Sequence, residues 1–322
     1  MTDMNTIGEK MDARKYIIDT DIGDDIDDIF AIYLAMRLKL NIVGITTVFR
    51  NTSERSRIVK KLLRSYANGY ENVPVYTGYG QTFENTADTI NHLVQYTSDL
   101  ELAEYTPDSE DPEMAIDFLI DSCNRYGEDL TIIAIGPFTN MARAIQKAPK
   151  AFEKCKVVIM GGAFFKQYAD WNVMCDVPAA DILFRSYPQL ECLGADVTHM
   201  LNIGEKNAKK ILTYEGKNAA VLYIKELLAL WTKCTGSTPM LHDPLAVYYA
   251  LNPTICKMKK ASIVVLTDSF AKGVTFNVDA YGKSDMNPAY KGFDVSKKIS
   301  VAANVKKEEM IELFMNEILA ED

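Results

Sequence analysis

The most distinctive segment of the sequence is an acidic run, DTDIGDDIDD, at residues 19–28. It holds six carboxylates, and it lies between a short apolar stretch and the apolar segment IFAIYLAMRL. Two carboxylates about 4 Å apart repel each other by roughly 4 kcal/mol at an effective dielectric constant near 20. Several can therefore converge only if they take up protons or gather a cation. Hard divalent cations prefer oxygen ligands, so the run predicts a Ca²⁺ site, with Mg²⁺ as the less favoured ion.

Helix capping explains only part of this acidic run. Aspartates favour the N-cap and the first turn of a helix, which accounts for one or two of them. It does not account for Asp19 and Asp21, which follow the preceding apolar stretch directly. An EF-hand loop is excluded, because the twelfth position counted from Asp19 is Phe30 and not glutamate.

Short strand-like runs alternate with amphipathic stretches along most of the chain. The amphipathic stretches include residues 53–67, 112–125 and 138–147. The strand-like runs are Tyr16–Asp21, Ile42–Val48, Val73–Thr77, Leu130–Gly136, Val157–Gly161, Leu190–Asp196 and Ile263–Thr267. This alternation predicts an α/β fold: an open, mostly parallel, Rossmann-like sheet flanked by helices. Ligands of such sheets bind beyond the carboxyl ends of the strands, where the acidic run lies.

The last third of the chain departs from this alternation. Two runs, Val274–Ala280 and Ile299–Val305, have no helical pattern between them and predict an antiparallel edge or a small hairpin. The segment Thr213–Lys233 predicts a long helix that caps the sheet. The chain has no repeat and no Pro/Gly/Ser-rich linker, so we expect a single domain over residues 1–322, structured from about 14 to 320.

Composition excludes several classes of protein. With 48% hydrophobic and 25% charged residues, the chain is typical of a soluble globular protein. A net charge of -9 disfavours broad contact with nucleic acid or an anionic membrane. The six cysteines form no C-x-x-C pair, and no apolar run is long enough to span a membrane. We therefore expect a cytoplasmic protein with a small-molecule partner.

Five further motifs follow the acidic run in order: ITTVFRN, IGPFTNMARA, VVIMGGAF, ADWNVMCDVPAA and LHDPLAVYYALNP. Together they resemble segments of the inosine-uridine preferring nucleoside hydrolases, from residue 16 to about 253. The resemblance implies Ca²⁺-dependent hydrolysis of the N-glycosidic bond of a riboside substrate, through a transition state like an oxocarbenium ion. It also implies a nucleoside hydrolase-like fold and a homodimer or homotetramer.

The resemblance also implies roles for individual residues. Four groups would hold the ion: Asp21, Asp28, Asp243 and the carbonyl of Ile135. Five side chains would contact the ribose or lie beside it: Asp25, Asp27, Asn51, Asp170 and Asn172. Asp21 would also activate a metal-bound water, and His242 would protonate or orient the leaving base. Trp231 is a candidate to stack on that base, whereas Trp171 is expected in the core and His199 as a structural polar group.

The acidic run itself departs from the family pattern, D-x-D-P-G-x-D-D. Ile22 replaces the proline, and two residues are inserted before the helix. Aligning the helix makes Asp27 and Asp28 the acidic pair of the family. Counting without a gap instead makes Asp25 the first member and leaves Ile26 at the second. We prefer the first alignment because it leaves two adjacent carboxylates directly before the helix.

Further departures lie outside the acidic run. Arg50 stands where the family has a glycine, and it could pair with a surplus aspartate or with an anionic substrate. Asp170 replaces a glutamate, and the 163–169 loop is shorter. Two alternatives to a nucleoside hydrolase therefore stay open. One is a relative that binds calcium and ribose without efficient turnover; the other, more distant, is a DxD-type Mg²⁺-dependent phosphohydrolase that would use Thr46 and Lys60.

Overall fold

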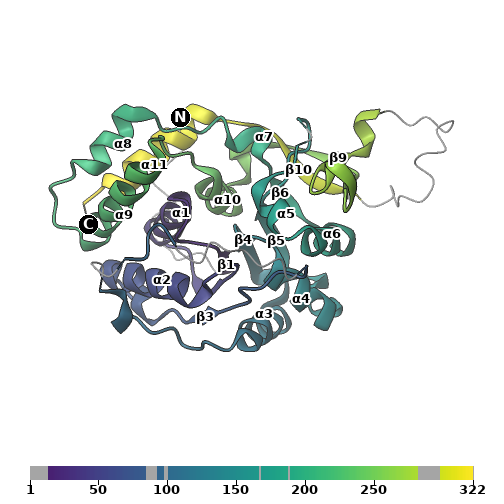
Figure 1. Cartoon of the computed structure of the whole chain (residues 1–322), viewed down its shortest axis with the longest axis horizontal. Helices are drawn as coiled ribbons and strands as arrows, with labels where there is room; N and C mark the ends of the chain where they lie inside the picture. The colour runs from purple at the N-terminus through teal and green to yellow at the C-terminus, as the bar shows by residue number, and fades with distance from the viewer. Residues whose placement is uncertain are drawn as a thin grey trace.

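An eight-stranded sheet forms the centre of the computed structural model, which describes residues 14–84, 93–97, 101–166, 168–187, 189–281 and 298–321. The strand order is β3-β2-β1-β4-β5-β6-β10-β7 (Figure 1). All neighbouring strands are parallel except the edge strand β7, which pairs antiparallel with β10. The predicted fold class, an open and mostly parallel α/β sheet, is confirmed. The strands are β1 (Lys15–Thr20), β2 (Ile42–Thr47), β3 (Val75–Thr77), β4 (Leu130–Ala134), β5 (Lys156–Met160), β6 (Glu191–Leu193), β7 (Cys256–Ala261) and β10 (Ile299–Val305).

Helices cover both faces of this sheet, so its central strands are buried on both sides and rich in β-branched residues (Figure 1). One face carries α3 (Pro112–Tyr126), α4 (Thr139–Lys147) and α6 (Val177–Ser186). The opposite face carries α1 (Asp27–Arg37), α2 (Thr52–Tyr66), α8 (Gly204–Leu212), α9 (Ala219–Thr235), α10 (His242–Leu251) and α11 (Lys307–Leu319). Two short helices, α5 (Trp171–Cys175) and α7 (Ala195–Thr198), follow β5 and β6.

Helix α1 lies inside the protein. Every residue from Asp27 to Met36 is buried, because α10 and α11 cover the side of α1 that faces away from the sheet. A helix that is apolar on all sides requires such a position. Its first two residues are aspartates, so this packing carries two carboxylates into the interior beside the end of β1.

The late strands differ in part from the prediction. The run at residues 263–267 contains β8 (Ile263–Val265), which lies outside the main sheet and pairs antiparallel with β9 (Thr275–Asn277). The two runs without a helix between them do not pair with each other, since β10 enters the main sheet between β6 and β7. The edge strand β7, CKMKKA, escaped prediction because its lysines are exposed and give it little apolar character.

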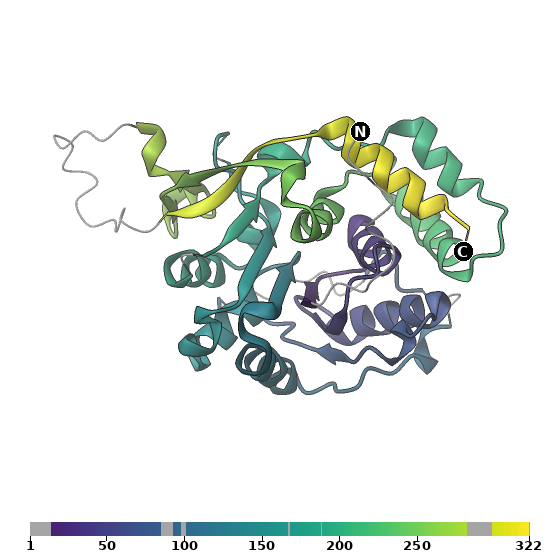
Figure 2. The same ribbon diagram turned by 180° about the vertical axis from the view of Figure 1, so that it is seen from behind.

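The predicted cap helix begins later than expected. Residues 213–218 join α8 to α9, and α9 packs against α2 beside the carboxyl ends of the strands. Figure 2 shows the yellow C-terminal segment, in which β10 leads to α11. None of the helices in the described part of the chain has the length and apolar character needed to cross a bilayer.

We expect Phe314→Ala to destabilise the protein by about 3–5 kcal/mol, because the substitution leaves a cavity under α11. The Phe314 ring is buried and its centroid lies 5.0 Å from that of Phe30 in α1. Denaturant unfolding measures the change. Phe270→Ala is the matched control, because Phe270 is fully exposed and its loss should change stability by less than about 0.5 kcal/mol. Equal effects of the two substitutions would contradict this packing.

Candidate active site

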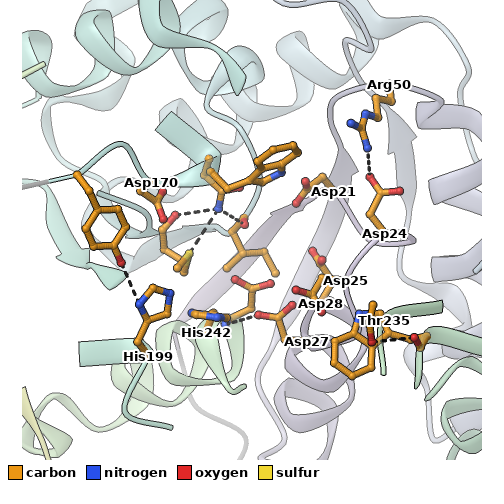
Figure 3. Close-up of a pocket in the computed structure, with 17 residues that line it drawn as sticks. Asp21, Asp24, Asp25, Asp27, Asp28, Arg50, Asp170, His199, Thr235 and His242 are labelled. Carbon is orange, nitrogen blue, oxygen red and sulfur yellow. Dashed lines mark hydrogen bonds and ion pairs between the residues drawn. The ribbon is translucent and has the colours of Figure 1, made fainter. Parts of the chain in front are cut away.

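A pocket of about 420 Å³ opens at the carboxyl ends of the central strands (Figure 3). Most of the residues that line it come from the ends of β1, β4 and β5 and from the starts of α1, α5 and α10, and Trp231 and Thr235 come from α9. The structure brings nearly all the predicted site residues together here: Asp21, Asp25, Asp27, Asp28, Ile135, Asp170, Asn172, Trp231, His242 and Asp243. The exception is Asn51, whose Oδ1 instead accepts a hydrogen bond from the Glu54 amide and caps α2.

Three buried carboxylates form the centre of the pocket: Asp27, Asp28 and Asp243. One ligand oxygen of each lies within 4.8 Å of the other two. The Thr20 hydroxyl donates to Asp28 Oδ1 at 2.5 Å, and the Asp243 amide donates to Asp27 Oδ2 at 3.3 Å. Burial, and then repulsion from neighbouring carboxylates, raises the pKa of each group well above its usual range. A set of oxygen donors that repel one another in this way fits a hard divalent cation.

Asp21 lies at the edge of this cluster, where β1 ends. Burial raises its pKa to about 6; the Arg55 charge opposes this shift, and Asp24 and Asp25 add to it. Gly136 makes the position of Asp21 possible. A Cβ atom at residue 136 would lie 2.9 Å from both the amide nitrogen and Oδ1 of Asp21. The glycine of the IGPFTN motif therefore allows a close approach between backbone and carboxylate.

Asn172 and Asp170 face the pocket from the start of α5. Asn172 Nδ2 donates to the carbonyl of Ile135 at 2.7 Å and to that of Met160 at 3.2 Å, which leaves the amide oxygen to accept from a ligand. Burial raises the pKa of Asp170 to about 6, and backbone amides around it lower it by less. Asp170 Oδ1 is buried without a hydrogen-bond partner. Part of the preceding loop, residue 167, lies outside the described residues.

Two histidines form one wall of the pocket. His242 Nδ1 and the Thr198 hydroxyl lie 2.6 Å apart, and burial lowers the pKa of His242 to about 4. The His199 ring packs edge-on against His242 at 5.3 Å between centroids, and its Nδ1 lies 2.9 Å from the Tyr168 hydroxyl. His242 is therefore neutral at neutral pH. His199, which the sequence predicts to be a structural polar group, lines the pocket.

The two tryptophans of the chain both line the pocket. Trp171 was expected in the core of a short strand, but it is the first residue of α5 and about half of it is exposed (53%). The expectation failed because the segment is a short helix at the mouth of the pocket and not a strand. Trp231 is largely buried in α9, and its side chain hydrogen-bonds that of Asp25.

The acidic run is held from the side by two arginines. Asp24 Oδ2 accepts from Arg50 at 2.8 Å and from Arg55 at 2.9 Å (Figure 3 shows the Arg50 pair). The expected pairing of Arg50 with a surplus aspartate is confirmed. The sequence did not indicate a role for Arg55, because an arginine in an amphipathic helix normally faces solvent.

The sequence did not indicate a role for Tyr168 either, because none of the motifs contains it.

The geometry also separates the alternatives left open by the sequence. Ile26, the second member of the acidic pair in the ungapped alignment, is fully buried in the hydrophobic core. Asp27 and Asp28, the pair in the gapped alignment, lie in the carboxylate cluster. Lys60, which a phosphohydrolase would need in the site, pairs with Asp108 at 2.6 Å and does not line the pocket. The gapped alignment therefore agrees with the structure, and Lys60 does not have the place in the site that a phosphohydrolase would require.

Comparison with known proteins gives one consistent result. Residues 16–312 match the family model described as inosine-uridine preferring nucleoside hydrolase. The protein named "Probable uridine nucleosidase 1" from Oryza sativa subsp. japonica is 28% identical over 97% of this chain and 98% of its own length. Uridine nucleosidase 1 from Arabidopsis thaliana is 29% identical over 93% and 91%. A solved plant nucleoside hydrolase, 26% identical, superposes with a TM-score of 0.80 over 96% of this chain and 100% of its own.

In chelator, the buried carboxylates should make the protein less stable as pH rises from about 4 to 7. The pKa values of Asp21 and Asp170, about 6, and of Asp19, about 7, exceed the usual 3.8. The folded state therefore binds protons more tightly than the unfolded chain, and deprotonation in this window costs folding free energy. Denaturant unfolding at about pH 5 and pH 7.5 measures the slope.

Added Ca²⁺ should reverse the loss at the higher pH, because it binds the ionised carboxylates. Asp243→Asn removes one repelling charge and should flatten both the pH dependence and the effect of Ca²⁺. A wild-type protein whose stability in chelator rises over this range would contradict the prediction, because the ionised carboxylates would then not oppose folding.

Proposed function

The chain is a member of the inosine-uridine preferring nucleoside hydrolase family, a group of hydrolases that act on N-glycosyl compounds, and we propose that it cleaves the N-glycosidic bond of a ribonucleoside with the help of bound Ca²⁺. The products are free base and ribose. One observation carries the proposal: Asp27, Asp28 and Asp243 converge in a pocket that Asn172 and His242 also line. Such a pocket offers a cation site, acceptors for sugar hydroxyls and a donor for a leaving base.

The donor set indicates how the ion would be held. Asp28 and Asp243 are its principal ligands, and Asp21 and the Ile135 carbonyl complete the set. All four contribute oxygen, as Ca²⁺ prefers, and all four line the pocket. Ca²⁺ held by these residues would supply Lewis-acid chemistry: it would lower the pKa of a water and bind ribose hydroxyls. Asp27 belongs to the same cluster and faces the sugar.

Asp21 acts as the general base that takes a proton from the attacking water. Its carboxylate lies at the end of β1 beside the proposed cation site, within the pocket that would hold that water. The ribose hydroxyls need acceptors at fixed positions, and three are available: the Asn172 amide oxygen, the unpartnered Asp170 Oδ1 and the carboxylate of Asp25. Asn172 and Asp170 are buried, which excludes water that would compete for the same hydroxyls, whereas Asp25 lies on the exposed side of the pocket.

His242 supplies a proton or a hydrogen bond to the leaving base. When the Thr198 hydroxyl donates to Nδ1, the neutral imidazole carries its proton on Nε2 and can donate a hydrogen bond to the leaving base from there. Trp231 lies across the pocket in α9 and offers a largely buried aromatic surface beside Asp25. Asn51 has no part in this proposal, because it caps α2.

Purified protein should release ribose from uridine or inosine in Ca²⁺, and a chelator should abolish the release. Asp21→Asn should lower kcat by roughly 10²–10⁴-fold, because the general base is lost, while circular dichroism stays unchanged. A reducing-sugar assay measures the rate. Wild-type protein that binds Ca²⁺ and ribose but releases no ribose from any nucleoside would favour the binding relative over the hydrolase.

His242→Ala should slow hydrolysis of nucleosides by roughly 10²–10⁴-fold, and hydrolysis of 4-nitrophenyl riboside much less. The nitrophenolate leaving group departs without protonation, so it bypasses the step assigned to His242. Asp21→Asn is the matched comparison, because it should slow both substrates equally. An equal loss on both substrates in His242→Ala would assign the histidine to sugar binding or to folding instead.

A further inference from the structure

Arg55 is the largest fully buried side chain of the described residues, although it belongs to the amphipathic helix α2 and does not line the pocket. Its Nε donates to the carbonyl of Phe49 at 2.7 Å. Its Nη1 donates to the carbonyls of Asp21 and Ile22, the latter at 2.8 Å, and its Nη2 to Asp24 Oδ2 at 2.9 Å. A buried guanidinium needs partners of this number and quality, since burying an unpaired charge is costly.

Three of these four acceptors belong to one short stretch of the acidic run, residues 21–24. This stretch lacks the proline of the family pattern, and Gly23 adopts φ +123°, a region open to glycine. Its sequence therefore does little to fix its backbone locally. The planar guanidinium of Arg55 donates to two successive carbonyls and to a carboxylate of this stretch. These bonds fix its backbone from the side of α2.

The loop after β2 is shaped to meet the same network. Phe49 and Arg50 both adopt left-handed backbone conformations, with φ +68° and +58°, which non-glycine residues rarely keep unless their surroundings impose them. Here the Phe49 carbonyl accepts from Arg55, and the Arg50 guanidinium donates to the carboxylate of Asp24 that Arg55 also holds. Two segments that follow neighbouring strands are thus joined through one buried side chain.

We propose that Arg55 is a positioning residue of the metal site: its guanidinium holds the backbone of residues 21–24 so that the carboxylate of Asp21 and the start of α1 face the cation. This role rests on the proposed function, because it presupposes that the carboxylate cluster binds Ca²⁺. It takes the place of the proline that this chain lacks.

The test is Arg55→Lys, which keeps the charge and loses the planar fork. Calorimetric titration with Ca²⁺ should show affinity weaker by about 10- to 100-fold. Loss of other groups that do not touch a metal but orient its ligands has an effect of this size. Arg57→Lys on the same helix is the matched control, because Arg57 bonds Glu110 and the Ala103 carbonyl and should leave Ca²⁺ affinity unchanged. In Arg55→Ala, added guanidinium ion should restore part of the affinity, and methylammonium should not.

Amide hydrogen exchange of residues 19–28 without metal is the second readout. It should be faster in Arg55→Lys than in the wild type, because the loop opens more often. A variant with a lower Tm but wild-type Ca²⁺ affinity and exchange would overturn the proposal and leave Arg55 a stabilising residue only. If Arg55→Lys does not fold, Asp24→Asn decides, since it removes one partner of the network and should weaken Ca²⁺ binding by a smaller factor; unchanged affinity overturns the proposal.

The outcomes distinguish this proposal from the proposed function. Wild-type protein that binds Ca²⁺ but hydrolyses no nucleoside would refute the hydrolase function, and the affinity of Arg55→Lys would still test the positioning role. Wild-type protein that binds no Ca²⁺ would refute the metal site and the role of Arg55 in it, whatever hydrogen exchange shows about the loop.

Discussion

Mutual repulsion among buried carboxylates is the constraint on which the rest of the structure depends. Asp27, Asp28 and Asp243 lie within a few ångströms of one another, away from solvent. Charges of one sign in such surroundings strongly oppose folding unless something compensates for them. The compensation is distributed: the N-termini of α1 and α10 direct their positive ends at the cluster, and the Thr20 hydroxyl donates to it. A cation bound as proposed would complete the compensation that these partial charges begin.

The hydrophobic cores on the two faces of the sheet stabilise the fold enough to hold these repelling carboxylates together. Helix α1 is apolar on every side behind its first two residues, so its position is fixed by packing and does not depend on its aspartates. The site is therefore built on rigid elements, and its carboxylates cannot relax by moving apart. Rigid placement of groups that repel one another is a recurrent way to preorganise a metal site.

Much of this could be predicted from the sequence, for identifiable reasons. The parallel sheet follows from β-branched runs spaced by amphipathic helices, and the site follows from polar motifs at the ends of those runs. What the sequence did not reveal depends on contacts between distant segments. Arg55 and His199 look like ordinary surface or structural residues until α2 and α7 are placed against the pocket. Asn51 matched a motif, yet its side chain serves the helix that it begins.

The hydrogen bond between the Asp243 amide and Asp27 joins two positions that are 216 residues apart in the chain. A cation held by both helices would act as a reversible cross-link that closes this long loop. Such a link restricts the unfolded chain most when the loop is long, so its loss would release much conformational entropy. During synthesis, the acidic segment emerges long before α10 exists, so Asp27 meets its partner in α10 only when the last third of the protein has been made. A cation that needs both Asp27 and Asp243 would therefore be captured late in folding.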